Sequence, residues 1–116
     1  MKAIDPRKNP ITPTPDHTRV TSQEIAGAIL GAKSCDVKLG FYEPGGNSIF
    51  HSHPHSEHVF YILEGQLTVV DEEKHEATAY PGEALYVPAG EVHMAENRGK
   101  VQTRYIAVTA PATVAK

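Results

Sequence analysis

The sequence predicts an all-β protein built as a small barrel or sandwich, and two observations support this fold class. From residue 37 onward, short runs rich in valine, isoleucine, leucine, tyrosine and phenylalanine alternate with turn residues roughly every eight to twelve positions. The turn residues are proline, which fixes φ, and glycine, which accepts positive φ. This pattern predicts strands at residues 37–42, 49–53, 58–63, 66–70, 76–80, 84–87, 92–97 and 101–109.

Length, composition and charge indicate one ordinary globular domain. The chain has 116 residues, of which 40% are hydrophobic and 22% charged. A net charge of −3 without a basic stripe argues against a nucleic-acid partner. The apolar runs are too short for a membrane span, and the first residues lack the apolar segment of a signal peptide. With Cys35 as the one cysteine, no internal disulfide can form, and we expect a cytoplasmic protein.

The first residues differ from the rest, and we expect an extended proline-rich arm at 1–17 followed by a barrel domain at 18–116. Proline density excludes a helix in the arm and predicts an edge strand or a segment that frays or lies along a partner subunit. The segment 21–30 stays open. Thr21 and Glu24 resemble a helix capping box, but Gly27 and Gly31 weaken a helix, so a helical turn and a strand both fit.

Four histidines carry the functional prediction. His51 and His53 share one face of a predicted strand, because side chains alternate along a strand. A turn at Pro54 lets His58 open the next strand toward the same interior, and His93 starts another inward-facing row. Imidazole suits iron, manganese, cobalt, nickel, copper or zinc better than magnesium or calcium. We therefore predict one divalent transition metal held by these four rings, its identity undetermined.

The remaining histidines receive other interpretations. His55 also forms a His-x-His pair, with His53, but its spacing to His58 is short, and we place it at the cavity mouth. His17 and His75 are expected to be exposed to solvent. Asn97 is expected to bind backbone groups at a bend.

Four further side chains are candidates for the cavity wall, with strand parity leaving inward and outward orientations open. An inward arginine could pair with a substrate carboxylate, whereas an outward one is a surface charge. Catalytic residues are otherwise unknown. The candidates are Tyr42, Phe60, Tyr86 and Arg104.

Two motifs in this sequence resemble those of the cupin superfamily. The family's second motif is Gly, five residues, Pro-x-Gly, two residues, His, three residues, Asn. Every fixed position of it is matched here, by Gly82, Pro88, Gly90, His93 and Asn97.

The first cupin motif is matched with two departures. One residue fewer separates Gly46 from His51, a count that Gly45 restores, and His58 stands where most of the family has glutamate. Glu57, one residue earlier, is expected to face outward. A subset of small bacterial cupins carries the same four-histidine variant.

The resemblance implies a double-stranded β-helix, the cupin jelly roll, as a single domain paired into a homodimer through sheet edges, with a small molecule in the barrel. It further implies a metal-binding cupin. We expect a small metalloenzyme, a dioxygenase-like oxidoreductase or a Lewis-acid catalyst, acting on a small oxygenated organic anion. Two alternatives stay open: a non-catalytic, metal-dependent module that binds a small molecule or sugar, and a sugar isomerase or other carbohydrate-processing cupin.

Overall fold

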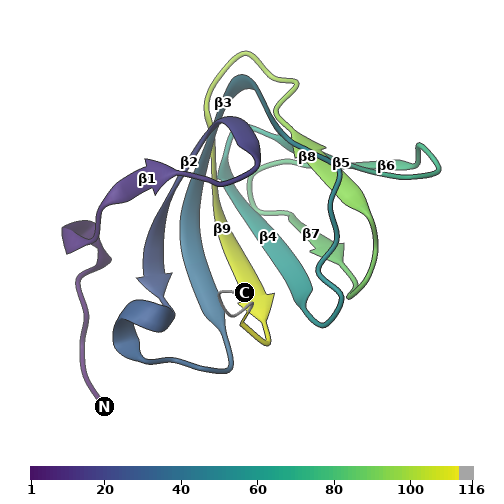
Figure 1. Cartoon of the computed structure of the whole chain (residues 1–116). Coiled ribbons are helices and arrows are strands. Elements are labelled where there is room, and N and C mark those ends of the chain that lie inside the picture. Colours follow the sequence, from purple (N-terminus) through teal and green to yellow (C-terminus); the bar gives the residue numbers. More distant parts are fainter. Residues whose placement is uncertain (113–116) are drawn as a thin grey trace.

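The computed structural model describes residues 1–112, and within them nine strands form one antiparallel sheet that closes into a nearly complete barrel (Figure 1). The predicted all-β jelly roll is therefore confirmed. Two single 3₁₀ turns, η1 and η2, complete the elements. In chain order these are η1 (Pro6–Lys8), β1 (Ile11–Pro13), β2 (His17–Ala26), η2 (Ala28–Leu30), β3 (Asp36–Ser48), β4 (Glu57–Glu64), β5 (Leu67–Asp71), β6 (Glu76–Ala79), β7 (Ala84–Val87), β8 (His93–Glu96) and β9 (Thr103–Ala110).

The long strand β3 joins the two walls of the barrel. One wall has the order β7-β4-β9-β3, with β2 and then β1 added at the far side of β3. The other wall is β6-β5-β8, and β8 meets the end of β3 where Asn47 pairs with Glu96. Figure 1 shows the two walls opening away from each other below this junction. The inner faces of both walls therefore enclose one interior.

Most predicted strands recur with shifted ends, but the strand predicted at 49–53 is wrong. β3 ends at Ser48, and the chain then runs as a loop in which Ile49 and Phe50 are exposed. Within that loop, His51 forms an isolated bridge to His93. The polar run before Pro54 offers no alternating apolar face to hold a full strand, and proline cannot donate to a ladder.

Residues 21–30, for which the sequence allowed either a helical turn or a strand, are mostly strand. β2 runs to Ala26, and the single turn η2 follows it. Pairing with β3 decides the outcome, because it satisfies the backbone along β2 and buries Val20 and Gln23 at 3% and 8% exposure. The pairing with β3 therefore outweighs the local helix-capping pattern of Thr21 and Glu24.

The N-terminal arm lies along its own barrel. β1 is an edge strand paired with β2, as the prolines predicted, and Asn9 and Gln23 exchange side-chain hydrogen bonds with each other's segments. The prediction that the arm contains no helix was wrong for one 3₁₀ turn, η1. Pro6 fits there because the first turn of a helix leaves its N–H groups without a helical partner. The arm boundary at residue 17 remains a prediction, and residues 113–116 of the expected domain lie outside the described residues.

The hydrophobic core fills the interior between the two walls. Ile62 and Leu67 are fully buried, and Phe60, Val69 and Ala107 pack against the core from its edge. Among the described residues, the structure contains no helix long and apolar enough to cross a membrane. The core residues are Val20, Tyr42, Ile62, Leu67, Ala79, Leu85, Ala95 and Tyr105.

Candidate functional site

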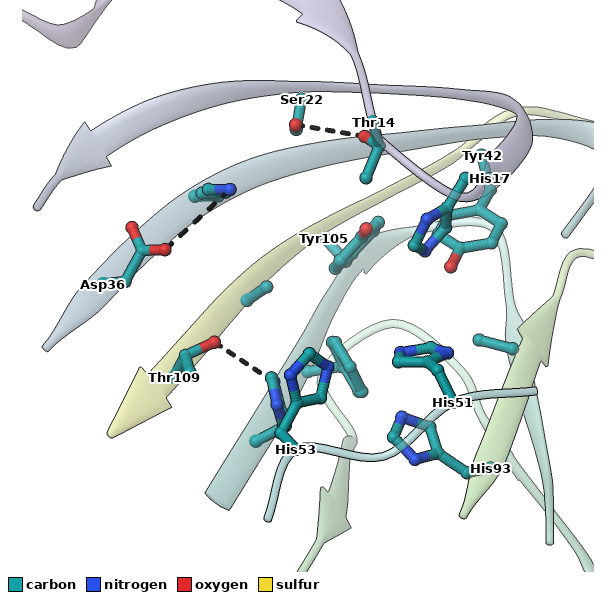
Figure 2. Close-up of a pocket in the computed structure, with 15 residues that line it drawn as sticks. Thr14, His17, Ser22, Asp36, Tyr42, His51, His53, His93, Tyr105 and Thr109 are labelled. Carbon is teal, nitrogen blue, oxygen red and sulfur yellow. Dashed lines mark hydrogen bonds and ion pairs between the residues drawn. The ribbon is translucent and has the colours of Figure 1, made fainter. Parts of the chain in front are cut away.

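A cavity of about 150 Å³ opens inside the barrel, and all four predicted histidines line it. Their rings are close neighbours. The ring centroids are 4.2 Å apart for His53 and His58, 4.5 Å for His51 and His93, and 5.0 Å for His51 and His53. Figure 2 shows His51, His53 and His93 gathered at one end of the cavity. The sequence therefore identified side chains that the fold does bring together.

The two motif loops are fastened to each other by backbone hydrogen bonds. His51 and His93 exchange two N–H to carbonyl bonds of 2.9 Å each. The amide of Gly90 donates to the carbonyl of His53 over 3.0 Å. Gly90 has φ of 82°, a left-handed conformation that favours glycine. The turn before β8 thus fixes the positions of three of the four histidines.

Hydrogen bonds at Nδ1 set the orientation and tautomer of two rings. His51 Nδ1 lies 2.8 Å from the carbonyl oxygen of Ile49, and His93 Nδ1 lies 2.9 Å from that of Glu91. A carbonyl oxygen only accepts, so each Nδ1 carries the hydrogen and donates. In a neutral ring, Nε2 then keeps its lone pair, which is the arrangement that metal-binding histidines use.

His58 is the most strongly perturbed member of the cluster. It lies at the start of β4, is 8% exposed, and its Nδ1 is 3.1 Å from the hydroxyl of Thr109 on β9. Its buried Nε2 has no hydrogen-bond partner in residues 1–112. Burial, followed by the neighbouring rings of His53, His93 and His51, lowers the pKa of His58 to about 4. Burial also lowers the pKa of His93. At neutral pH the rings of His58 and His93 are therefore uncharged.

These observations test whether the cluster suits a metal. Over residues 1–112, no three histidine, cysteine, aspartate or glutamate side chains already stand together as a metal-binding group. The four imidazoles share the cavity without forming a coordination sphere. Their donor chemistry does fit a transition metal, because imidazole is a ligand that such metals prefer and the buried Nε2 of His58 lacks a partner within residues 1–112.

The structure separates the four candidates for the cavity wall, whose orientation the sequence left open. Tyr42 and Phe60 line the cavity. Tyr86 is 59% exposed on the outer face, where its hydroxyl donates to the Glu57 carboxylate. Glu57 therefore faces outward, as expected.

Arg104 also points outward, where it forms a 2.9 Å ion pair with Glu64. Its neighbour Tyr105 takes the inward position instead, since side chains alternate along β9. Asn97 has the predicted structural role. Its side chain donates to the carbonyls of Tyr42 and Val101 over 3.0 and 2.9 Å.

Sequence reasoning missed His17 and Tyr105. His17 was expected in solvent but lines the cavity, with its ring centroid 5.9 Å from those of His51 and Tyr42. Burial lowers the pKa of His17. Nothing in the proline-rich arm signals this placement. His75 is exposed, as expected. His55 was placed at the cavity mouth, but it is exposed and is not among the residues that line the cavity.

The family is established by comparison with known proteins. The family model described as "Cupin domain" matches residues 39–109, and the chain belongs to this family. The tetracenomycin polyketide synthase protein TcmJ of Streptomyces glaucescens is 38% identical over 89 residues, covering 72% of this chain and 59% of TcmJ. The chain spans between 36% and 59% of the length of the curated relatives that it matches.

Solved structures support the same fold. The polyketide cyclase RemF of Streptomyces resistomycificus superposes with a TM-score of 0.79 at 21% identity, covering 100% of this chain and 88% of RemF. A predicted oxalate decarboxylase of Thermotoga maritima gives a TM-score of 0.79 at 18% identity, covering 96% of this chain and 100% of the other. At these identities the likeness concerns the fold alone.

Proposed function

We propose that this cupin is a small metalloenzyme that binds one divalent transition metal through His51, His53, His58 and His93. The observation that carries the proposal is the cluster of four histidine rings in the cavity, of which His58 and His93 are buried, with Nδ1 of His51 and His93 committed to carbonyl oxygens. The ring orientations described above would have to adjust for their nitrogens to converge. The metal could be iron, manganese, cobalt, nickel, copper or zinc.

The substrate that we propose is a small oxygenated organic anion, such as a keto acid or an enolised dicarbonyl compound. Four neutral imidazoles leave the full charge of a divalent ion uncompensated, which favours anionic oxygen donors. A bound metal would supply Lewis-acid activation of the substrate oxygens. The protein's own contribution is an apolar wall, including Phe60 and Ala107, that limits water around the ligand.

The size of the cavity narrows the substrate class. TcmJ and RemF bear names linked to polyketides, compounds rich in carbonyl and phenol oxygens. A cavity of about 150 Å³ is smaller than the roughly 300 Å³ at which pockets for drug-sized ligands begin. A small keto acid or dicarbonyl therefore suits this chain better than a multi-ring polyketide.

Metal content tests the proposal first. We expect about one transition-metal ion per purified chain, and at least tenfold weaker binding after His58→Ala or His93→Ala, because each removes a donor. His55→Ala and His75→Ala are the matched controls and should keep the metal. Elemental analysis with electron paramagnetic resonance provides the measurement. Equal metal content in H58A and the unmodified protein would contradict the proposal.

Turnover tests the catalytic part separately. The metal-loaded protein is screened against small keto acids, diketones and phenols, with oxygen consumption and product formation followed together. Oxygen uptake would indicate dioxygenase-like chemistry, and turnover without it would indicate Lewis-acid chemistry. A loaded protein that binds these compounds but converts none would favour the non-catalytic binding module.

A further inference from the structure

His17 reaches the cavity through an irregularity in β2. The β2–β3 register shifts between Thr18 and Val20, which pair with Asn47 and Tyr42, so the extra residues at this irregularity lie on β3. On β2, Arg19 between them has a left-handed φ of 59°. Regular alternation would place Thr18, rather than His17, on the inward face with the buried Val20. Because a left-handed residue interrupts the regular alternation of side chains along a strand, the residues before it can face the opposite side. His17 therefore faces the cavity, and Thr18 is exposed.

The backbone around His17 is held in an unfavourable conformation. Asp16 and Arg19, which bracket His17, have φ of 60° and 59°, a left-handed region that non-glycine residues rarely adopt. Such conformations persist where surrounding structure enforces them, and they cluster at functional sites. Here the Asp16 carbonyl accepts a hydrogen bond from the amide of Ile49, and β2–β3 pairing fixes His17 opposite Ser48.

The tautomer of His17 follows from one hydrogen bond. Its Nδ1 lies 2.6 Å from the carbonyl oxygen of Pro15. Because the carbonyl can only accept, Nδ1 carries the hydrogen, and Nε2 of the neutral ring is an acceptor. Figure 2 shows the His17 ring beside Tyr42, at the end of the cavity away from His93.

A pair of buried tyrosines provides a hydrogen-bond donor at the same place. The rings of Tyr42 and Tyr105 are 5.5 Å apart, and both residues line the cavity. A phenolic hydroxyl carries one O–H hydrogen that it can donate to a ligand. Gly40 makes this packing possible, since a Cβ there would lie 2.2 Å from Cζ of Tyr105.

We propose that His17 and the Tyr42–Tyr105 pair form a second polar contact of the cavity, which recognises an enol or hydroxyl group beside a carbonyl on the ligand. The ligand's hydroxyl would donate to Nε2 of His17, and its carbonyl would accept from the tyrosine pair. This inference rests on the proposed function, in which the histidine cluster holds the other end of the ligand. The substrate class becomes small acids with a second, enolisable carbonyl, such as 2,4-dioxo acids.

Two keto acids that differ in one group test this recognition. 2,4-Dioxopentanoate and 2-oxopentanoate have the same chain length and the same keto-carboxylate, but the first alone has the remote enolisable carbonyl. We titrate both into Co²⁺-loaded protein and follow the visible absorption of the metal. The expected preference for 2,4-dioxopentanoate is roughly five- to tenfold, the size of one or two net hydrogen bonds.

Variants locate the preference. His17→Phe and Tyr42→Phe keep ring packing and should each reduce the preference toward unity, with 2-oxopentanoate binding unchanged. His17→Gln retains an acceptor oxygen and should restore part of the preference for 2,4-dioxopentanoate. His75→Phe is the control, because His75 lies outside the cavity. Thermal unfolding checks that each variant folds. If Co²⁺ binds but neither H17F nor Y42F alters the preference, this inference is overturned and the metal site stands. Failure to bind Co²⁺ overturns both.

Discussion

At the scale of single residues, His58 links the chemistry of the cavity to the stability of the fold. Folding buries this ring and lowers its pKa to about 4, against 6.5 for an exposed histidine. The unfolded chain therefore binds a proton between these two pH values that the folded chain does not. Since protons then favour the unfolded state, the contribution of His58 to stability is lost as pH falls from 6.5 toward 4.

A pH series of unfolding experiments on metal-free protein checks this consequence. Relative to His58→Phe, which cannot take up the proton, the unmodified chain should lose about 1–3 kcal/mol of unfolding free energy between pH 7 and pH 4. His93 and His17 shift in the same direction and remain in both proteins. Parallel stability curves for the two proteins would contradict the assignment. Chelator is present throughout, so that metal release does not contribute.

The sequence predicted single residues well where a motif fixed the spacing. The four histidines line one cavity and Asn97 binds backbone carbonyls, although His51 and His53 come from a loop and not from the predicted strand. The orientations of Tyr86 and Arg104 stayed open because side-chain parity depends on where a strand is irregular, as in the β4–β9 register shift between Ile62 and Glu64. Such shifts arise from pairing between distant segments, which a single sequence does not display.

At the scale of elements, β3 and β9 show how one glycine positions a cavity residue. Gly40 pairs with Tyr105 across the two strands, and the tyrosine ring lies directly over the glycine backbone. A Cβ at Gly40 would stand 2.2 Å from Cζ and 2.4 Å from the hydroxyl oxygen of Tyr105. The ring is 6% exposed and packs beside Tyr42 and Phe60, whose ring centroids lie 5.5 and 5.8 Å away, so a shift of the ring would disturb these contacts. This strand pair therefore depends on the absence of a side chain at one position.

Gly40→Ala should accordingly destabilise the protein by about 1–3 kcal/mol, the usual range for overpacking a buried position. With Tyr105→Ala already present, the same change should be neutral or mildly stabilising, because alanine suits a strand interior better than glycine. Denaturant unfolding of the four proteins gives the coupling free energy between the two sites. A coupling near zero would show that the ring does not rest on Gly40.

β2 illustrates why sequence reasoning failed at this scale. Its capping signals and glycines left helix and strand open, and only pairing with β3 decides between them. The left-handed conformation of Arg19, at the register shift beside which His17 turns inward, has no signature in composition or periodicity. The turn-bounded strands β4 to β9 were predicted closely, because their limits are set locally by glycine and proline.

At the scale of the whole molecule, the outer face of the β7-β4-β9 wall is unusually apolar. Val59, Tyr61 and Tyr86 are 37%, 44% and 59% exposed, and Val59 pairs directly with Tyr86. On β9, Ile106 pairs with Tyr61, and both lie on this face. We define these side chains as the outer patch. Contiguous exposed apolar side chains of this kind mark interaction surfaces.

The occupant that we propose for the outer patch is a second copy of this chain. Glu57 carries a negative charge at one end of the patch, and Arg104 lies at the other end, paired with Glu64. A two-fold axis through the patch would place Glu57 of each copy toward Arg104 of the other. An isologous contact of this type is self-complementary. It replaces the sheet-edge pairing expected from the sequence with a face-to-face contact.

Light scattering during size-exclusion chromatography measures the oligomeric state directly. The unmodified protein should have twice the 12.6 kDa chain mass. Val59→Glu should produce monomers, because a dimer would bury an unpaired carboxylate, which costs several kcal/mol. Val101→Glu is the control, since Val101 is 63% exposed but lies outside the patch. A monomeric unmodified protein would exclude the second copy, and dimers of V59E would show that another surface pairs the chains. The cavity opens inside the barrel, so V59E monomers should bind metal as the dimer does.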